Sequence, residues 1–491
     1  MTSSDTCPTP PQSATHNDPA GPTPPDSPVP STSISTMQDP NALNPYPSLV
    51  RSQQIYLHPS AFPLECGATL PAPVPVAYKT FGTLDASKSN VIAIFHAVSG
   101  SADVSDWWAP LLGPGHSFDT RRFFIVCCNV LGSPYGSASP LTINPETGKQ
   151  WGPDFPVASV RDDVRLFKHV YDHLGIKRIQ FAIGGSMGGM HALEMAAELG
   201  PEYVRFVVPI ASVSRLGAWG ISWGEAQRQC IFADPNYQNG HYSASARPNA
   251  GLASARMQAM LTYRSHHSFE ARFGRKIMVS KPQSAARVKA EAGAHVANAS
   301  LKLAHNDGAA HFGQAPNETL TGAEPTHKLT AGVFSAQSYL RYQGDKFVAR
   351  FDANCYIALT RKMDTHDVAR GRWVGEDDED EDDGERHWRA VRAAVKQPAL
   401  VLGVESDGLF AIGEQRALAE CLEDAELQVI DSPDGHDGFL LEFEQVGRHI
   451  GKFMRERAPE WFAESVGQQD GHTVGETEFS STFGEADLVA W

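Results

Sequence analysis

Paired cysteines are missing from this sequence of 491 residues. Its seven cysteines are scattered without the spacing of a disulfide framework or a metal-ligand cluster, and two of them, Cys127 and Cys128, are adjacent in an apolar stretch. This usage is typical of reduced thiols in an intracellular protein. We therefore expect a cytoplasmic protein with no bound metal.

Long apolar runs and a targeting signal are also missing. No run approaches the roughly 18 apolar residues of a membrane-spanning helix. The N-terminus has neither the basic region nor the apolar core of a secretory signal, and its shortage of arginine argues against a mitochondrial presequence. These absences predict a protein without membrane association.

An excess of positive charge is missing as well, since the net charge is −16 at pH 7. Four aspartates and no lysine or arginine occur in the first fifty positions, and residues 376–383 are eight consecutive acids. Acidic runs of this kind are usually solvated loops, and without them the chain is close to neutral. The charge gives no electrostatic basis for binding nucleic acid.

A glycine-rich turn with one serine is the most informative motif present. Ser186 lies in the sequence Gly-Gly-Ser-Met-Gly, after the apolar run 179–183 and before the helix-like run 190–197. A strand, a sharp turn carrying a serine and a helix form the nucleophile elbow of the α/β-hydrolase fold. We expect Gly184 and Gly188 to be required where a Cβ would collide, and the helix to direct its first amide groups at negative charge beside the serine.

A catalytic serine of this fold needs an acid and then a histidine later in the chain. The apolar run 398–404 predicts a buried parallel strand followed by Glu405 and Asp407, and the run 427–430 predicts the next strand, with His436 in the loop after it. We expect Asp407 to accept the imidazole N–H of His436, which fixes the tautomer and supports the imidazolium formed when the serine loses its proton. Glu405 is the alternative acid.

The loop 96–103 follows another apolar strand, 90–95, and is expected to complete the oxyanion hole. Backbone N–H groups of Val98 and Met187 would then converge on the tetrahedral intermediate, each donor contributing roughly 3 kcal/mol. His96, at the end of the strand, is expected to have a structural role and not a catalytic one.

Three blocks of the sequence carry a family resemblance: the loop 96–103, the elbow block 184–190, and the block 435–440 around the predicted catalytic histidine. Together they resemble the signature blocks of homoserine O-acetyltransferases. The stretches that resemble the fungal branch in particular are 133–137, 140–144, 222–236, 334–344 and 483–486. The resemblance runs from about residue 54 to the C-terminus. It implies the α/β-hydrolase fold, a mostly parallel central sheet flanked by helices, with an inserted helical lid.

The resemblance implies acyl transfer in two steps, with acetyl-CoA as co-substrate and no bound cofactor. Ser186 would take the acetyl group, and His436 would pass its proton to the departing CoA thiol. His436 would then deprotonate the hydroxyl of L-homoserine, which attacks the acetyl-serine and gives O-acetyl-L-homoserine, a precursor of methionine. We also expect a homodimer formed through the lid.

The resemblance further points to residues that bind the amino acid. In the family a lid arginine binds the carboxylate, and Arg228 is the matching residue, since its planar fork suits a carboxylate. The aspartate after the catalytic histidine binds the amine in the family, which points to Asp437. A lid tyrosine is also expected, with Tyr237 or Tyr242 as candidates. Ser99 stands where the family usually has a threonine, and it keeps a hydroxyl in the pocket.

The same triad leaves other activities open. Transfer to water would make the protein a serine esterase. Serine or deacetylcephalosporin C as acceptor, or succinyl as the acyl group, would make it a neighbouring acyltransferase. A non-catalytic binding protein of this fold is disfavoured because all three triad members are present.

Composition divides the chain into parts with different expected structure. In chain order these are a Pro/Ser/Thr-rich disordered segment over 1–48, the first part of the core over 49–214, a helical lid over 215–395, the second part of the core over 396–458 and a tail over 459–491. Low-complexity inserts are expected in the lid at about 276–328 and 375–386.

Overall fold

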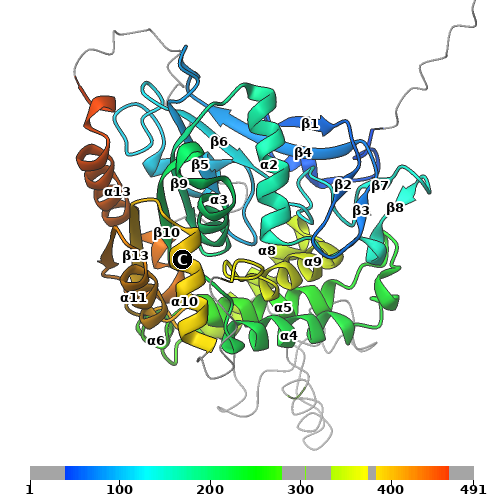
Figure 1. Cartoon of the computed structure of the whole chain (residues 1–491). Helices are drawn as coiled ribbons and strands as arrows, with labels where there is room; N and C mark the ends of the chain where they lie inside the picture. The colour runs from blue at the N-terminus through cyan, green and yellow to red at the C-terminus, as the bar shows by residue number, and fades with distance from the viewer. Residues whose placement is uncertain (1–38, 279–304, 306–332, 374–382, 464–491) are drawn as a thin grey trace, which may run out of the picture. The chain divides into compact units, whose positions relative to one another are not determined.

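A mixed β-sheet forms the centre of the structure, a computed structural model that describes residues 39–278, 305, 333–373 and 383–463 (Figure 1). Its strands lie in the order β1 (Gln54–His58), β4 (Val74–Phe81), β6 (Phe124–Cys128), β5 (Val91–Phe95), β9 (Ile179–Gly185), β10 (Val204–Ile210), β13 (Ala399–Val404) and β14 (Ala425–Ile430). The pairs β1–β4 and β4–β6 are antiparallel, and the other neighbours are parallel. This mostly parallel sheet confirms the predicted fold class. Smaller pairs are β2 (Phe62–Pro63) with β3 (Thr69–Leu70), and β7 (Ile143–Asn144) with β8 (Lys149–Gln150).

Alternate side chains of each strand pack on opposite faces of the sheet. In β5, Ala93 and Phe95 join one core cluster, whereas Ile92 and Ile94 join the other. One face is covered by α2 (Val160–Leu174), α3 (Met187–Tyr203), α10 (Asp383–Ala394) and α11 (Ile412–Cys421), and the other by α1 (Val104–Trp107) and α13 (Phe443–Arg457). Because both faces are covered, the central strands are buried along their length, which explains their continuous apolar runs.

The chain between β10 and β13 forms most of the helical lid that is expected over 215–395. Its helices are α4 (Ala218–Phe232), α5 (Asn249–Tyr263), α6 (His266–Arg272), α8 (Ser335–Arg350) and α9 (Ala353–Asp364), with a short antiparallel pair β11 (Ile277–Met278) and β12 (Val333–Phe334). Helix α10, which falls within the predicted lid, packs instead on α3 and α11 of the core. The predicted inserts lie mostly outside the described residues.

Residues 39–48 are folded, which corrects the predicted end of the disordered segment. Asn41 and Asn44 are buried, and their side-chain amides donate to backbone carbonyls of the loop 134–136 at 2.9 Å. Tyr46 opens the 3-10 helix η1 (Tyr46–Leu49) and is also buried. The Pro-rich composition concealed this segment because two amide side chains and a single buried aromatic residue hold it, too few for an apolar pattern. The rest of that predicted segment, and nearly all of the predicted tail, lie outside the described residues.

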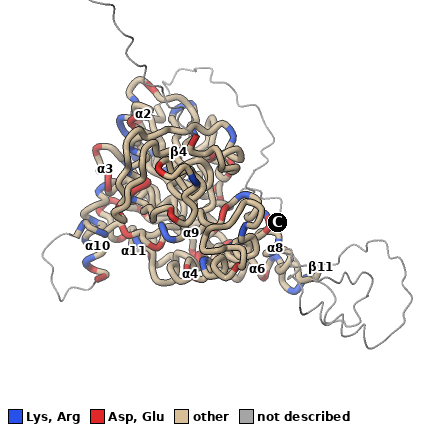
Figure 2. Tube along the Cα trace, turned by 90° about the vertical axis from the view of Figure 1, so that its right-hand side faces the viewer, with Lys and Arg blue, Asp and Glu red and all other residues tan. Residues whose placement is uncertain are grey.

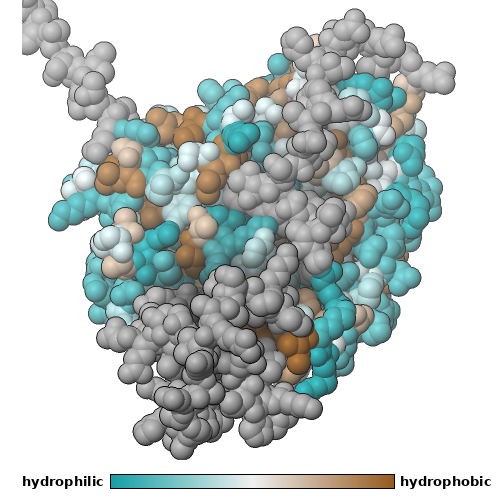
Figure 3. Space-filling model, turned by 180° about the vertical axis from the view of Figure 1, so that it is seen from behind, coloured by the Kyte–Doolittle hydropathy of each residue, from teal (hydrophilic) through white to brown (hydrophobic). Residues whose placement is uncertain are grey.

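Charges of both signs are mixed along the described chain, as Figure 2 shows. Figure 3 shows the rear face, where apolar surface forms separate patches among hydrophilic side chains. In the described ranges, no helix has both the length and the apolar character needed to cross a membrane.

Candidate active site

Ser186 stands between β9 and α3 in a strained backbone conformation. Its φ of 58° and ψ of −126° lie outside the regions that residues with a Cβ usually adopt. A Cβ on Gly184 would collide with the backbone of Gly188, and one on Gly188 would collide with the Phe95 carbonyl. The two glycines therefore allow the tight turn that presents the serine at the N-terminal end of α3. This is the geometry of a nucleophile elbow.

The predicted acid and base meet beyond the carboxyl ends of β13 and β14. His436 lies in the 3-10 helix η6 (Gly435–Asp437), and its Nδ1 atom is 2.7 Å from Oδ2 of Asp407. Oδ1 of Asp407 accepts the backbone N–H groups of Leu409 and Phe410 at 2.8 and 2.9 Å. These bonds hold the carboxylate, which in turn orients the imidazole.

Glu405, the alternative acid, takes no part in this arrangement. Its side chain is exposed and pairs with Arg416, with 2.8 Å between Oε2 and Nη2. The geometry therefore favours Asp407 as the partner of the histidine.

His436 and Ser186 line one cavity. Nε2 of His436 is buried and has no hydrogen-bond partner among the described residues. Burial alone would lower the pKa of His436, but the carboxylates of Asp407 and Asp437 outweigh it and hold the pKa above its usual value. The imidazole is thus suited to take a proton from a neighbouring hydroxyl.

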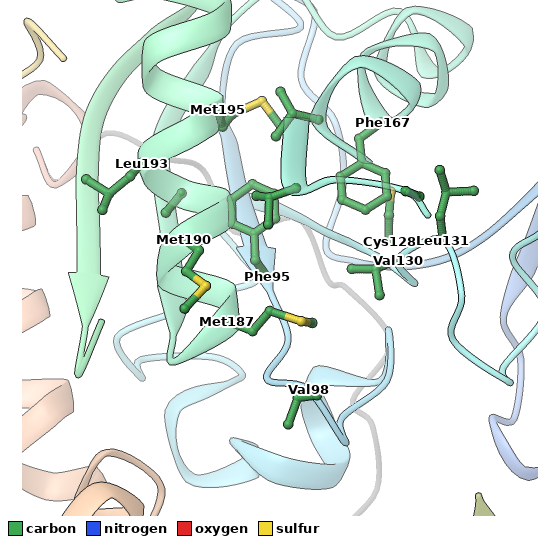
Figure 4. Packing of buried hydrophobic residues seen from close by; sticks show 14 of the residues in the cluster. Phe95, Val98, Cys128, Val130, Leu131, Phe167, Met187, Met190, Leu193 and Met195 are labelled. Atoms are coloured by element: carbon green, nitrogen blue, oxygen red, sulfur yellow. The ribbon is translucent and has the colours of Figure 1, made fainter. Parts of the chain in front are cut away.

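The loop after β5 brings Val98 and Ser99 to the wall of the same cavity. Arg350 of α8 donates to the Ser99 carbonyl at 2.9 Å, so a lid residue holds this loop. Met187 is the first residue of α3, and Figure 4 shows it at the end of the helix nearest Val98. The N–H groups of Val98 and Met187 therefore remain the predicted pair of oxyanion donors.

His96 bridges two loops beside the cavity. Its Nδ1 atom lies 2.8 Å from the Ala97 carbonyl, and Nε2 accepts the Val130 N–H at 3.3 Å. Full burial lowers the pKa of His96 to about 4, so the ring stays neutral. These bonds agree with the predicted structural role.

Four basic residues of the lid line the cavity, and no sequence pattern predicted them. Arg256 lies in α5 and Arg264 follows it, whereas Lys346 and Arg350 lie in α8. Asp437 lines the same cavity and pairs with Arg264, with 2.9 Å between Oδ2 and Nε. Basic residues spaced four or eight positions apart lie on one face of a helix, and this spacing was the available signal. The sequence does not show that this face meets the cavity, because that depends on how the lid helices pack.

Arg228 and Tyr237, two of the predicted substrate-binding residues, do not line this cavity. Arg228 is buried in α4 and pairs with Asp364 at 2.7 Å, while its Nη1 atom has no hydrogen-bond partner among the described residues. Tyr242, the other candidate tyrosine, donates its hydroxyl proton to a lid carboxylate. Direct roles for Arg228 and Tyr237 thus rest on the family resemblance, whereas Asp437 and Ser99 reach the cavity.

The six cysteines within the described ranges are free thiols. Across those ranges, no three His, Cys, Asp or Glu side chains gather in a way that could hold a metal ion.

Comparison with known proteins places the chain among its relatives. Residues 90–443 match the family model described as alpha/beta hydrolase fold. The homoserine O-acetyltransferase of Emericella nidulans is 50% identical, covering 91% of this chain and 96% of that protein. The homoserine O-acetyltransferase of Saccharomyces cerevisiae is 45% identical, covering 91% and 95%.

Solved structures share the fold at low sequence identity. The homoserine O-acetyltransferase from Bacillus anthracis aligns with a TM-score of 0.63 at 21% identity, over 82% of this chain and 97% of that one. Esterase E22 aligns with a TM-score of 0.63 at 24% identity, over 82% and 99%. These two structures establish the fold alone, and the two fungal relatives establish the family. The chain belongs to the homoserine O-acetyltransferase family of the α/β-hydrolase fold.

Proposed function

We propose that this chain transfers the acetyl group of acetyl-CoA to the hydroxyl of L-homoserine through an acetyl-enzyme on Ser186. The observation that carries the proposal is a strained serine and a carboxylate-bound histidine at one cavity. It is supported by 50% identity to a fungal homoserine O-acetyltransferase over most of the chain. The product, O-acetyl-L-homoserine, is a precursor of methionine.

In the first half-reaction Ser186 attacks the thioester carbonyl while Nε2 of His436 takes the hydroxyl proton. Charge develops on the carbonyl oxygen, where the N–H groups of Val98 and Met187 and the positive end of α3 stabilise it. When the intermediate collapses, the C–S bond breaks and His436 returns the proton to the CoA thiolate. Asp407 keeps the imidazolium oriented throughout.

In the second half-reaction homoserine replaces CoA at the cavity. His436 takes the proton of the γ-hydroxyl, and the alkoxide oxygen attacks the acetyl carbon of acetyl-Ser186. The second tetrahedral intermediate uses the same oxyanion donors. Its collapse breaks the bond to the serine oxygen, which recovers the proton from His436.

Charge at the cavity wall supports an anionic donor and a zwitterionic acceptor. The four lid cations supply positive charge for the phosphates of CoA, namely Arg256, Arg264, Lys346 and Arg350. Asp437 is assigned to the ammonium group of homoserine and Ser99 to a polar contact in the pocket. An esterase that acts on simple esters needs neither the cations of the lid nor the carboxylate of Asp437.

The carboxylate of homoserine is assigned to Arg228, with Tyr237 as a second contact from the lid. The support for Arg228 is the family resemblance and a buried Nη1 atom that has no partner among the described residues. Arg256, which lines the cavity, is the alternative.

The experiment that tests the function combines the pure protein with acetyl-CoA or succinyl-CoA, and with homoserine, serine, deacetylcephalosporin C or water alone. We expect acetyl-CoA with homoserine to give the highest kcat/KM and water the lowest rate. A higher kcat/KM with another acceptor or donor would assign a neighbouring acyltransferase activity. Hydrolysis as fast as transfer at saturating homoserine would make the protein an esterase.

We further propose a homodimer formed through the lid, in the cytoplasm. Apolar exposure on three lid helices supports the dimer, since Trp219 of α4, Leu261 of α5 and Tyr342 of α8 are 60%, 49% and 50% exposed. The free state of the six described cysteines supports a reducing compartment.

A further inference from the structure

Asp163, His191 and Lys362 form a buried cluster behind the nucleophile elbow. They come from α2, α3 and α9, and their side chains are at most 1% exposed. Lys362 pairs with Oδ2 of Asp163 and donates to the Leu131 carbonyl at 2.8 Å, while Oδ1 of Asp163 accepts the Leu131 N–H at 2.8 Å. A lid helix thus supplies an ammonium group to the core, although none of the three residues lines the cavity.

Both ring nitrogens of His191 lie within hydrogen-bond distance of oxygen atoms. Nδ1 lies 2.8 Å from the Met187 carbonyl, and Nε2 lies 2.8 Å from Oδ2 of Asp163. Burial alone would raise the pKa of Asp163, but Lys362 and His191 outweigh it and hold the pKa below its usual value, so the carboxylate remains an acceptor. Because a carbonyl and a carboxylate only accept, each ring nitrogen must carry a proton. The two bonds are therefore those of an imidazolium.

The surroundings of His191 suit a cation. Its ring stacks against Phe95 and Phe167, with centroids 6.0 and 6.2 Å apart, and both phenylalanines are labelled in Figure 4. Aromatic faces attract a cation in a desolvated site. His96 nearby differs, because its Nε2 atom accepts an N–H group and its ring is neutral.

We propose that His191 is a positioning residue that stays protonated through the reaction, holds the Met187 carbonyl and places a fixed positive charge one helical turn behind the oxyanion hole. The carboxylate of Asp163 provides the hydrogen bond and the opposite charge that keep this imidazolium inside the protein, and the Lys362 ammonium binds the same carboxylate oxygen. The oxyanion on the acyl carbon is then stabilised by a preorganised charge in addition to the backbone donors. The inference rests on the proposed acetyl-enzyme, since it concerns the intermediates on the path to it.

The first test removes the charge with His191→Gln, which keeps a hydrogen-bond donor. We expect the single-turnover rate of Ser186 acetylation to fall about tenfold, less than the roughly 10²- to 10³-fold lost with a direct oxyanion donor. The dissociation constant of acetyl-CoA should not change. A trifluoromethyl ketone analogue of acetyl-CoA, which forms an oxyanion with the serine, should bind more weakly by the same factor.

His387→Gln is the matched control. His387 is also fully buried, lies 2.9 Å from Oγ of Ser214 and does not line the cavity. Its variant should keep the wild-type acetylation rate and analogue affinity. Equal losses in both variants, or slower acetylation by His191→Gln with unchanged analogue affinity, would overturn the proposal.

The second test needs no turnover. Nitrogen NMR of the full chain with labelled histidine reports whether both ring nitrogens carry a proton. We expect an imidazolium signal that vanishes in His191→Gln, or in His191→Phe if the first variant does not fold. A neutral ring at His191 overturns the proposal. If the wild type forms no acetyl-Ser186, the proposed function fails while the NMR result for His191 stands by itself.

Discussion

Among single residues, two carboxylates act on the histidine proposed as the base. Asp407 binds Nδ1 of His436 and Asp437 lies beside it, and together they raise its pKa against the lowering effect of burial. The base works in its neutral form. Single-turnover acetylation of Ser186 should therefore rise with pH through a pKa above the usual value of about 6.5 and level off beyond it.

Asp437→Asn should move this limb of the pH profile toward lower pH, because a neutral amide no longer favours the imidazolium. The first half-reaction contains no homoserine, so the shift is separate from any loss of amino-acid binding. Asp434→Asn, on the same loop, serves as the control and should leave the limb in place. If the pH profile of acetylation is the same in Asp437→Asn as in the wild type, Asp437 does not raise the pKa of His436.

Ser186→Ala should lower acetyl transfer by at least about 10³-fold and leave the fold intact, because the acyl-enzyme route is lost. Mass spectrometry of the wild type with acetyl-CoA alone should find one acetyl group, on the peptide that carries Ser186. An adduct on another peptide, or an active alanine variant, would refute the assignment.

Arg228→Ala and Arg256→Ala separate the two candidate ligands for the homoserine carboxylate. The true ligand should raise the homoserine KM about 30-fold or more when truncated, as expected for one partner of a buried charge pair. Its variant should acetylate Ser186 at a near-normal rate. If only Arg256→Ala raises the homoserine KM, Arg256 binds the carboxylate and the assignment of Arg228 from the family resemblance is wrong. A loss confined to acetylation would assign the arginine to the CoA side.

The candidate triad could be predicted from sequence, whereas the cationic lining could not. Ser186, Asp407 and His436 each follow an apolar strand, and the carboxyl ends of parallel strands meet at one edge of the sheet. Arg256 and Lys346 reach the cavity only because α5 and α8 pack together. That packing depends on contacts between distant segments, which no local pattern encodes.

At the scale of elements, strands were easier to predict than helix junctions. The apolar runs that predict β9, β13 and β14 agree with the structure to within two residues. The expected helical lid over 215–395 includes no boundary between α8 and α9, which are separated by extended backbone at Phe351 and Asp352. Asp352 caps α9 by accepting the N–H groups of Asn354 and Cys355 at 2.9 and 3.2 Å. An aspartate before a new helix was the available signal.

The folded segment 39–48 should contribute measurably to stability. Asn44→Ala removes the side-chain bond to the Pro134 carbonyl and leaves a buried acceptor without its donor, so the free energy of unfolding should fall by about 1–2 kcal/mol. Leu43→Ala is the control, because this neighbouring side chain is 60% exposed and its loss should cost less than about 0.5 kcal/mol. Denaturant unfolding measures both. Equal stability of the two variants would mean that the segment is not held by this bond.

For the whole molecule, the exposed apolar side chains of the lid bear on the proposed dimer. Leu261→Asp together with Tyr342→Asp should convert the dimer to a monomer, because two charges would be desolvated at the interface. Ile55→Asp, at an exposed position on β1, should remain dimeric. Sedimentation velocity measures the state, and a lid variant that stays dimeric would relocate the interface.

The insertion of the lid between the two parts of the core also sets an order in time. Ser186 is synthesised roughly 250 residues before His436, which at about 5–20 residues per second is an interval of roughly 10–50 s. During that interval β13 and β14 do not yet exist, and the serine is an ordinary alcohol with no imidazole beside it. On the proposed mechanism, we therefore expect a nascent or truncated chain to meet acetyl-CoA without reacting, and acylation to begin only when the last strands have docked.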